Sequence, residues 1–317
     1  MRGIRKTRQI TRAMKMVATV KLRHAQTTLI NARPYAERMR EITARLLAGQ
    51  EEMPDDNPFF AKREIKKSLH VIVSTDRGLC GSLNTNLFRY VLNFPPPALR
   101  TPPERGPSKV PSSGGVVDSS AVALAKAEGR GGAEFDLKMP PNVEFLLVGR
   151  KARDFFKARQ AAGGKYQIRD AMLFEAADAS VLGRNICELY RSRSVDRIEL
   201  FYTVSSSALR QQPQNLRLFP MDLSEMRKGG KVESLMFEPP VAGMLDDLVS
   251  AYAENVLRRI FMEAAVAEHA ARMFTMDLAT KNADDLISEM QLDMNKLRQL
   301  IITRELADIT TGAEAIG

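Results

Sequence analysis

A stretch of 68 residues, from Met244 to Thr311, contains neither glycine nor proline. These two residues are the strongest helix breakers, so the stretch predicts one continuous helix, about 100 Å long at about 1.5 Å per residue. We expect Gly312 to cap its C-terminus. A helix of this length far exceeds those of ordinary globular domains, and the chain must therefore fold into something elongated.

Side chains in this stretch follow a register of alternating four- and three-residue steps. Most positions in the register are apolar, and a seven-residue repeat of this kind is typical of a left-handed coiled coil. The polar exceptions are Asn255, Arg259, His269 and Thr280. The predicted seam consists of Leu245, Leu248, Tyr252, Asn255, Arg259, Met262, Val266, His269, Met273, Met276, Thr280, Ala283, Ile287, Met290, Met294, Leu297 and Ile301.

The first 50 or so residues predict the partner helix. Pro34 can kink it, and Gly49, followed by Pro54 and Pro58, should end it. Its second half continues the heptad-like steps through Tyr35, Met39, Ile42 and Leu46. The two helices flank one compact region, so they can pair antiparallel. Because the N-terminal helix is shorter, part of the long helix must stand alone or pack on that region.

The net charge of +9 arises at the N-terminus. Nine basic residues precede Glu37, the first acid, and the remaining 38 of the 47 basic residues balance the 38 acidic ones. The excess is thus local to segments such as RQITRAMKMVATVKLRHAQ, from Arg8 to Gln26, and is not a basic face of the whole protein. Such a segment suits nucleic acid, a membrane surface or an acidic partner. A transit peptide is also Arg-rich, but it would not need the heptad continuation.

Three short apolar runs in the middle of the chain predict buried strands: LHVIVS from Leu69, VEFLLVG from Val143 and RIELFYTVSS from Arg197. Helical stretches at 151–160 and 179–192 fall between them, and another helix follows the first strand. Strands that alternate with helices predict an open, mostly parallel α/β sheet of the Rossmann-like kind.

We therefore divide the chain into a coiled-coil helix at 1–62, an α/β domain at 63–240 and a second coiled-coil helix at 241–317. The α/β domain carries an insert at about 94–141, which holds nine of the sixteen prolines and several glycine and serine clusters. We expect this insert to be a poorly ordered surface excursion, with one short helix at 121–129.

The chain offers no clear chemical site. The turn DRGLCGSLN follows the first strand, where a phosphate could bind, but its spacing is not GxGxxG, and GxxxxGK[ST] is absent. A tight strand-to-helix turn is the simpler explanation. His24, His70 and His269 are too scattered for a metal site, and Cys80 and Cys187 form no CxxC motif. The sequence predicts no catalytic residue, cofactor, metal or membrane span.

Several segments closely resemble the gamma subunit of F-type ATP synthases: KMVATVKLRHAQ, STDRGLCGSLNTN, ARMFTMDLATKNADDLISEM and LRQLIITRELADITTGAEAI. The resemblance is strong at both ends, weaker across 143–240 and absent in the insert, and the chain starts some residues later than typical members. It implies a rotor shaft without a catalytic site. One copy stands inside a hexamer of alpha and beta subunits, and its body sits on the membrane c-ring with an epsilon/delta-type subunit. Proton-driven rotation would then change the three catalytic sites in turn.

The resemblance also implies contacts between this rotor and its stator. Met14 and Arg272 would lie side by side where the shaft leaves the hexamer. Near the C-terminus, Arg298 and Gln299 follow Leu297 of the predicted seam, so they should point away from the partner helix. Two further upper contacts are Thr303 and Glu305. Basic residues expected to face acidic loops of the catalytic subunits are Lys6, Arg8, Arg12 and Lys15, along with Arg272 on the partner helix.

A second function class stays open, a nucleotide- or nucleic-acid-binding α/β module with a coiled-coil arm. As for the gamma-subunit interpretation, chloroplast members of that family carry an extra cysteine pair that this chain lacks. The resemblance therefore implies the mitochondrial inner membrane, on its matrix side, with the bacterial cytoplasmic membrane as the alternative. The long insert favours a mitochondrial member.

Overall fold

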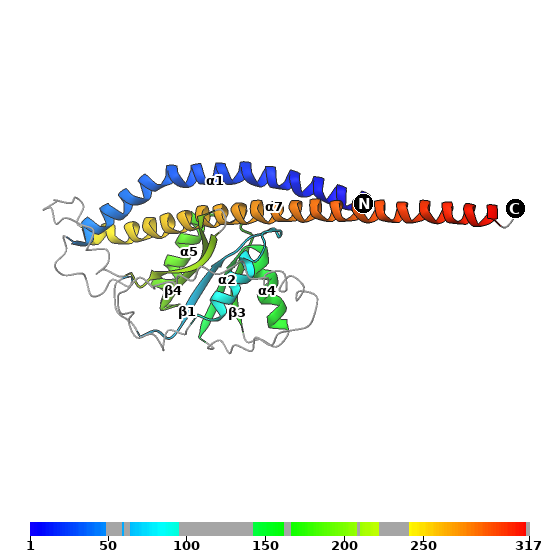
Figure 1. Cartoon of the computed structure of the whole chain (residues 1–317). Coiled ribbons are helices and arrows are strands. Elements are labelled where there is room, and N and C mark those ends of the chain that lie inside the picture. Colours follow the sequence, from blue (N-terminus) through cyan, green and yellow to red (C-terminus); the bar gives the residue numbers. More distant parts are fainter. Residues whose placement is uncertain are drawn as a thin grey trace, which may run out of the picture.

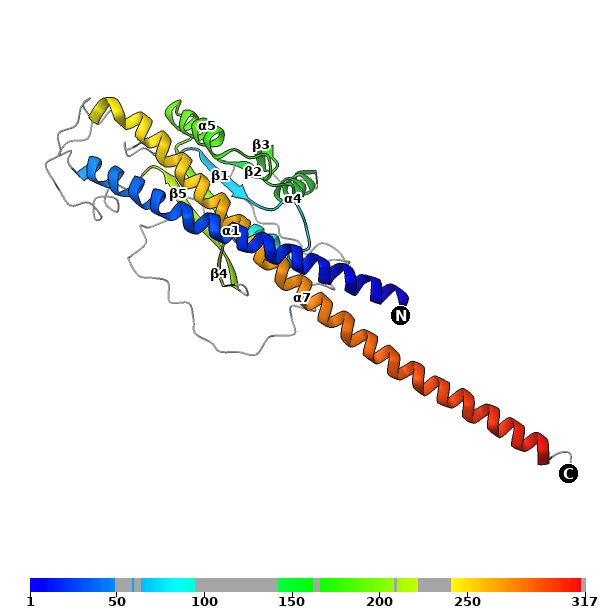
Figure 2. The same ribbon diagram turned by 90° about the horizontal axis from the view of Figure 1, so that it is seen from above.

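The computed structural model describes residues 1–48, 59, 64–94, 142–161, 166–207, 210–221 and 241–314. The chain forms a two-helix rod with an α/β body attached along one side of it (Figure 1). The C-terminal helix continues far past the N-terminus as a lone helix (Figure 2). The predicted insert, including its short helix, falls almost wholly outside the described residues, as does the predicted stop at residues 49–58.

The rod consists of α1, Arg2–Ala48, and α7, Val241–Glu314, which run antiparallel. Three contacts fix their register: Arg8 with Asp284 at 2.8 Å, Lys15 with Asp277 at 2.6 Å, and Thr11 with Thr280 at 2.9 Å. Between these contacts and the base of the rod, an apolar seam is built from Leu22, Val266 and Ala270, with Ala25, Leu29 and Met273 beside them. The predicted antiparallel pairing is confirmed.

One prediction about a helix end was wrong. Gly312 does not cap α7, which continues through it to Glu314. Glycine lowers helix propensity by about 1 kcal/mol relative to alanine but does not forbid the helix. Pro34 lies inside α1 without ending it.

The body is built on a five-stranded sheet in the order β3-β2-β1-β4-β5. The three predicted strands appear as β1, β2 and β4, which pair in parallel. The sequence missed β3, which pairs parallel to β2, and β5, which pairs antiparallel to β4. The strand bounds are Ser68–Val73, Val143–Val148, Gln167–Met172, Arg197–Ser207 and Arg210–Phe219 for β1 to β5.

Helices cover both faces of this sheet. On one face α2, Leu83–Leu92, and α4, Arg150–Ala161, enclose a core with Phe145 and Phe201. On the other face α5, Ala179–Arg191, packs beside the lower part of α7. The rod is therefore not merely attached to the body, because α7 is itself one of the helices that cover the sheet.

This second role of α7 changes the predicted seam. In its lower part the fully buried residues are Val249, Ala253, Leu257 and Ile260, all in the core shared with the sheet. Predicted seam positions such as Tyr252 are only partly buried there. The seam prediction was thus wrong for the lower part of α7, because the sheet and not α1 receives its most apolar face.

Candidate functional site

The upper part of α7 is the most unusual surface of the described chain. Beyond Ile287, every described side chain of α7 is exposed. Large apolar side chains continue along it nonetheless, at Leu292, Met294, Leu297, Leu300, Ile301, Ile302, Leu306 and Ile309. Exposed apolar surface on this scale marks a site of interaction with another molecule.

The predicted upper contact residues all lie on this segment and are exposed: Arg298, Gln299, Thr303 and Glu305. The reason given for their orientation was wrong. Leu297 and Ile301 are 59% and 57% exposed, so they are not on a seam. The register of the rod places Arg2 opposite the region of residue 290, and α1 ends before it reaches these positions. Among the described residues, every side of α7 beyond Ile287 is exposed.

The base of the exposed segment is set by polar contacts between α1 and α7. Lys15 binds Asp277, and Lys281 approaches the same carboxylate at 3.4 Å. The hydrogen bond from Lys15 is the main reason that the pKa of Asp277 lies below its usual value. Arg8 binds Asp284 in an ion pair of 2.8 Å. Two of the predicted stator-facing cations, Arg8 and Lys15, thus already have partners within the chain.

Met14 and Arg272 do not lie side by side. Lys15 is level with Asp277 and the helices run antiparallel, so Met14 is level with residue 278, six residues beyond Arg272, and the two are offset by about 9 Å along the axis. Met14 is half-buried, and the Arg272 side chain is only 11% exposed. The structure turns Arg272 toward the body of this chain.

Arg272 joins α7 to the turn between β1 and α2. Its Nη2 donates to Glu268 Oε1 at 2.6 Å and to the Gly78 carbonyl at 3.4 Å, and its Nη1 lies 3.4 Å from His269 Nδ1. Burial raises the pKa of Glu268 despite the opposing effect of Arg272. Burial, followed by the charges of Arg272 and Lys21, lowers the pKa of His269 to about 4.

The turn that Arg272 contacts is tight, as predicted. Leu79 and Gly81 both adopt positive φ, at 64° and 60°. A Cβ on Gly81 would lie 2.9 Å from Thr275 Oγ1 of α7, so glycine permits the close approach of turn and helix. Cys80 and Leu83 pack against two alanines of α7, Ala267 and Ala271.

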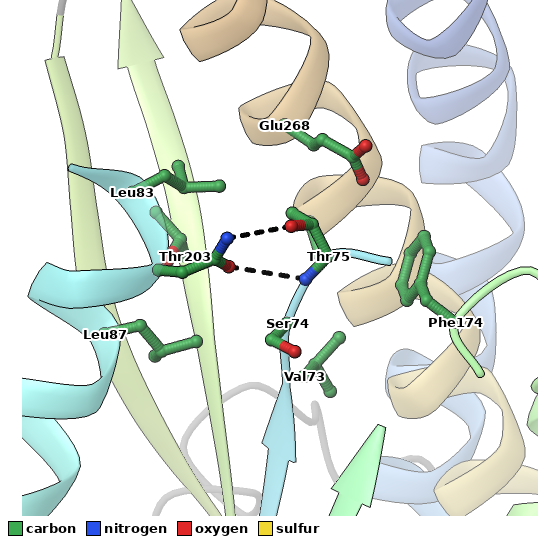
Figure 3. Close-up of a pocket in the computed structure, with 10 residues that line it drawn as sticks. Val73, Ser74, Thr75, Leu83, Leu87, Phe174, Thr203 and Glu268 are labelled. Atoms are coloured by element: carbon green, nitrogen blue, oxygen red, sulfur yellow. Dashed lines mark hydrogen bonds between the residues drawn. The ribbon is translucent and has the colours of Figure 1, made fainter. Parts of the chain in front are cut away.

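The crevice beside this turn is where a nucleotide would be expected. In open α/β sheets, ligands bind at the carboxyl ends of the strands where the strand order reverses, here between β1 and β4. The crevice is closed by Glu268 and Ala264 of α7, and Asn84 bridges to Thr75 within it (Figure 3). Its remaining cavity of about 10 Å³ has room for one water molecule. The nucleotide-binding alternative therefore finds no cavity here.

A metal site and a membrane span would each place requirements on the described part of the chain. No cluster of His, Cys, Asp and Glu there could hold a metal ion. His24 is exposed on α1, His70 lies in the sheet and His269 faces Arg272. Across the same described ranges, no helix combines the length and the apolar character that a bilayer crossing requires.

Sequence reasoning missed the residue that organises this region, Asp76. Its Oδ1 accepts from the backbone N–H groups of Arg150 and Phe174, at 2.8 and 3.0 Å, and its Oδ2 accepts from that of Glu175 at 3.0 Å. Burial alone would raise the pKa of Asp76, but these three donors outweigh it and leave the pKa below its usual value. The only signal in the sequence was an acid directly after a buried strand.

Comparisons with known proteins agree on one family. A family model described as ATP synthase matches residues 1–103 and 117–316. The gamma chain of Moorella thermoacetica ATP synthase is 35% identical over 99% of this chain and 96% of that protein. The gamma chain of Heliobacterium modesticaldum is 32% identical over 100% of this chain and 96% of that protein.

Two solved structures share the fold. The rotor of the Euglena gracilis mitochondrial ATP synthase matches with a TM-score of 0.57 and 19% identity, over 95% of each chain. The central stalk and c-ring structure of Tetrahymena thermophila mitochondrial ATP synthase matches with a TM-score of 0.53 and 18% identity, over 86% of this chain and 99% of that chain.

Proposed function

Because this chain belongs to the ATP synthase gamma chain family, we propose that it is the central rotor shaft of an F-type ATP synthase. It would couple proton-driven rotation of the membrane c-ring to ATP synthesis or hydrolysis in a hexamer of alpha and beta subunits. One observation of the molecule carries this proposal. The upper α7 is a long lone helix with exposed apolar side chains on all sides, which suits an axle surrounded by a sleeve.

The composition of the upper α7 suits this role. Residues 288–314 contain no aromatic residue, whereas the lower α7 has Tyr252, Phe261 and Phe274. Aliphatic and methionine side chains fill contacts without the large planar groups that would lock one orientation. A rotating shaft needs contact with the surrounding subunits on every side without interlocking with them, and the composition of this segment suits both needs.

The other end of the molecule would serve as the foot of the rotor. In this proposal the body and the lower rod sit on the c-ring together with an epsilon/delta-type subunit, peripheral to the membrane. The location expected from the sequence is the matrix side of the mitochondrial inner membrane. The two gamma chain relatives described above come from bacteria, and they support the alternative, the bacterial cytoplasmic membrane.

Two groups of residues would contact the stator. At the top, Arg298 and Gln299 form a catch that bonds an acidic loop of one open beta subunit at a time, with Thr303 and Glu305 beside it. An Arg guanidinium can bond a carboxylate through two parallel hydrogen bonds, and Gln supplies both a donor and an acceptor. Each bond must break as the shaft turns, so the catch biases which site opens without locking the rotor.

At the base, Lys6, Arg8, Arg12 and Lys15 would face acidic loops of the catalytic subunits, and Met14 would be a further stator contact. Lys15 is 42% exposed even though it binds Asp277, so it can bind Asp277 and a loop of a catalytic subunit at the same time. Arg272 remains in the proposed contact with a narrower role, because its buried side chain can order the turn at Gly78 but does not reach outward.

Purification and turnover test the proposal together. The chain should co-purify with alpha and beta subunits, and Arg298→Ala combined with Gln299→Ala should cut ATP turnover severely while the complex still assembles. Arg258→Ala is the matched control, because Arg258 is an exposed cation of α7 that pairs with Glu254 of the same helix. Near-normal turnover in the double variant would sink the catch. A chain that purified alone, or with nucleic acid released by salt, would sink the rotor assignment.

A further inference from the structure

The crevice between the carboxyl ends of β1 and β4 is occupied by part of the chain itself. Open α/β sheets usually leave this crevice free for a ligand. Here Ala264 and Glu268 of α7 fill it, and the neighbouring Arg272 reaches the turn at its rim. A charged helix segment thus stands where a charged ligand would otherwise bind.

The contacts in this crevice are largely directional, whereas lower on the rod apolar contacts dominate beside polar ones such as Ser180 to Glu254 at 2.5 Å and Arg191 to Asp246 at 2.8 Å. Below it, α7 meets the sheet through apolar side chains such as Leu257 and Ile260, and apolar contacts have no preferred direction. In the crevice, Arg272 bonds both Glu268 and the Gly78 carbonyl, and Thr275 lies against Gly81 too closely for any side chain there. Bonds and close steric contacts resist a twist of the helix about its own axis, because small shifts break them.

The turn between β1 and α2 is itself anchored to the rest of the body. The Asp76 carboxylate accepts hydrogen bonds from the backbone N–H groups of Arg150 at the start of α4 and of Phe174 and Glu175 after β3. Thr75 bonds the side chain of Asn84 at the start of α2, at 2.8 Å. A force on the turn is therefore passed to three separate connections of the sheet.

The sheet ends also approach closely at this anchor. Gly149 has a φ of 102°, and a Cβ there would lie 2.3 Å from the Ser74 carbonyl oxygen. Ser74 Oγ accepts from the backbone N–H of Ala152 at 3.0 Å and donates to the Val148 carbonyl at 3.1 Å. The ends of β1 and β2 are thus locked directly behind the turn, and the anchor has little freedom to yield.

We propose that residues 74–84, together with Glu268, Arg272 and Thr275, form a socket that carries torque between the shaft and the body. This inference rests on the proposed rotor function. In it, the ligand crevice of the α/β fold has become the joint at which α7 is held against twisting. Asp76 and Glu268 are positioning residues, which act through the turn and through Arg272.

Single-molecule rotation measures this joint directly. The complex of this chain with alpha and beta subunits is immobilised through the subunits, and a probe is attached to the body at Lys157→Cys, an exposed position of α4. The two native cysteines are buried and leave the label specific. With the shaft stalled, the angular spread of the probe reports the torsional stiffness between shaft and body.

Weakening the socket should widen this spread. Glu268→Gln and Asp76→Asn should each increase the angular variance roughly two-fold, because a well-packed joint transmits strain and a loosened one absorbs it. Thr75→Val is a milder variant that removes only the hydroxyl bonded to Asn84. The control is Glu144→Gln, which removes the partner of Arg169 from a 2.6 Å ion pair outside the socket. An unchanged variance in the assembled socket variants, or an equal increase in the control, would overturn the proposal.

A second measurement uses the full chain without its partners. Hydrogen exchange in Glu268→Gln should show amides 74–84 and 264–275 losing protection together, because the turn and the helix segment hold each other. Independent changes in the two segments would contradict the socket. This outcome does not depend on assembly, so a failure of the rotor assignment and a failure of the socket are distinguishable.

Discussion

The lower and upper parts of α7 have similar apolar content but opposite surroundings. In the lower part, Leu257 and Ile260 are completely buried against the sheet. In the upper part, Leu297 and Leu300 are 59% and 66% exposed. One helix thus serves as a structural element of the body over its lower part and presents exposed apolar side chains over its upper part.

This difference teaches that apolar periodicity specifies a covered helix face but not what covers it. The sheet covers the lower part and α1 covers the middle. In the described part of the chain, the side chains of the upper part are exposed. A helix without tertiary packing gains little stability from propensity alone. The upper α7 therefore depends on whatever molecule surrounds it, which is consistent with the proposed sleeve.

Truncating the same side chain in the two parts should separate them most clearly. Leu257→Ala should lower the free energy of unfolding of the full chain by about 2–5 kcal/mol, because it leaves a cavity in the shared core. Leu297→Ala should change it by no more than about 0.5 kcal/mol, because that side chain is 59% exposed in the described part of the chain. Urea unfolding followed by circular dichroism measures both. A cost above about 2 kcal/mol for Leu297→Ala would show that the upper helix has an internal partner.

Acid should destabilise the chain through His269 of α7, which lies below the exposed upper part. Because burial holds His269 neutral, its pKa is about 4 in the folded chain and near 6.5 when unfolded. The unfolded chain therefore binds the proton first, and stability falls as the pH drops from about 6.5 to about 4, by at most about 1.4 kcal/mol per pH unit. Glu268 opposes this at lower pH, because its raised pKa lets the folded chain bind a proton more readily.

The titration of His269 can be isolated with His269→Gln, which keeps a polar side chain but binds no proton. Unfolding curves across this pH range should be flatter for the variant than for the natural chain. His24→Gln is the control, since His24 is exposed on α1. An equally steep fall in both variants would assign the acid sensitivity to other groups.

The comparison also shows what the sequence could and could not predict. The absence of glycine and proline predicted α7, and the apolar runs predicted β1, β2 and β4. The strand β3 was missed because an edge strand such as QIRDAM is mostly exposed, and β5 because RQQPQNLRLF is polar and contains Pro213. Both lie at the edges of the sheet, where burial leaves little pattern.

The socket was out of reach of sequence reasoning for a different reason. Asp76 bonds backbone groups that lie 74, 98 and 99 residues away, and backbone N–H groups carry no sequence signature. Arg272 was noticed only through a family resemblance, which assigned it outward. Its inward orientation depends on Glu268 and on the position of Gly78, and both follow from the tertiary fold.

The smallest effect on stability is expected at the border between the covered and the exposed parts of α7. Arg8 and Asp284 form an ion pair there, with side chains 40% and 52% exposed. A double-mutant cycle with Arg8→Ala and Asp284→Ala should give a coupling of about 0–1 kcal/mol, because water and side-chain entropy offset most of an exposed pair. At 1 M salt the coupling should vanish. A coupling above about 2 kcal/mol would mean that this ion pair fixes where coverage ends. A weak one would mean that this ion pair does not set the border.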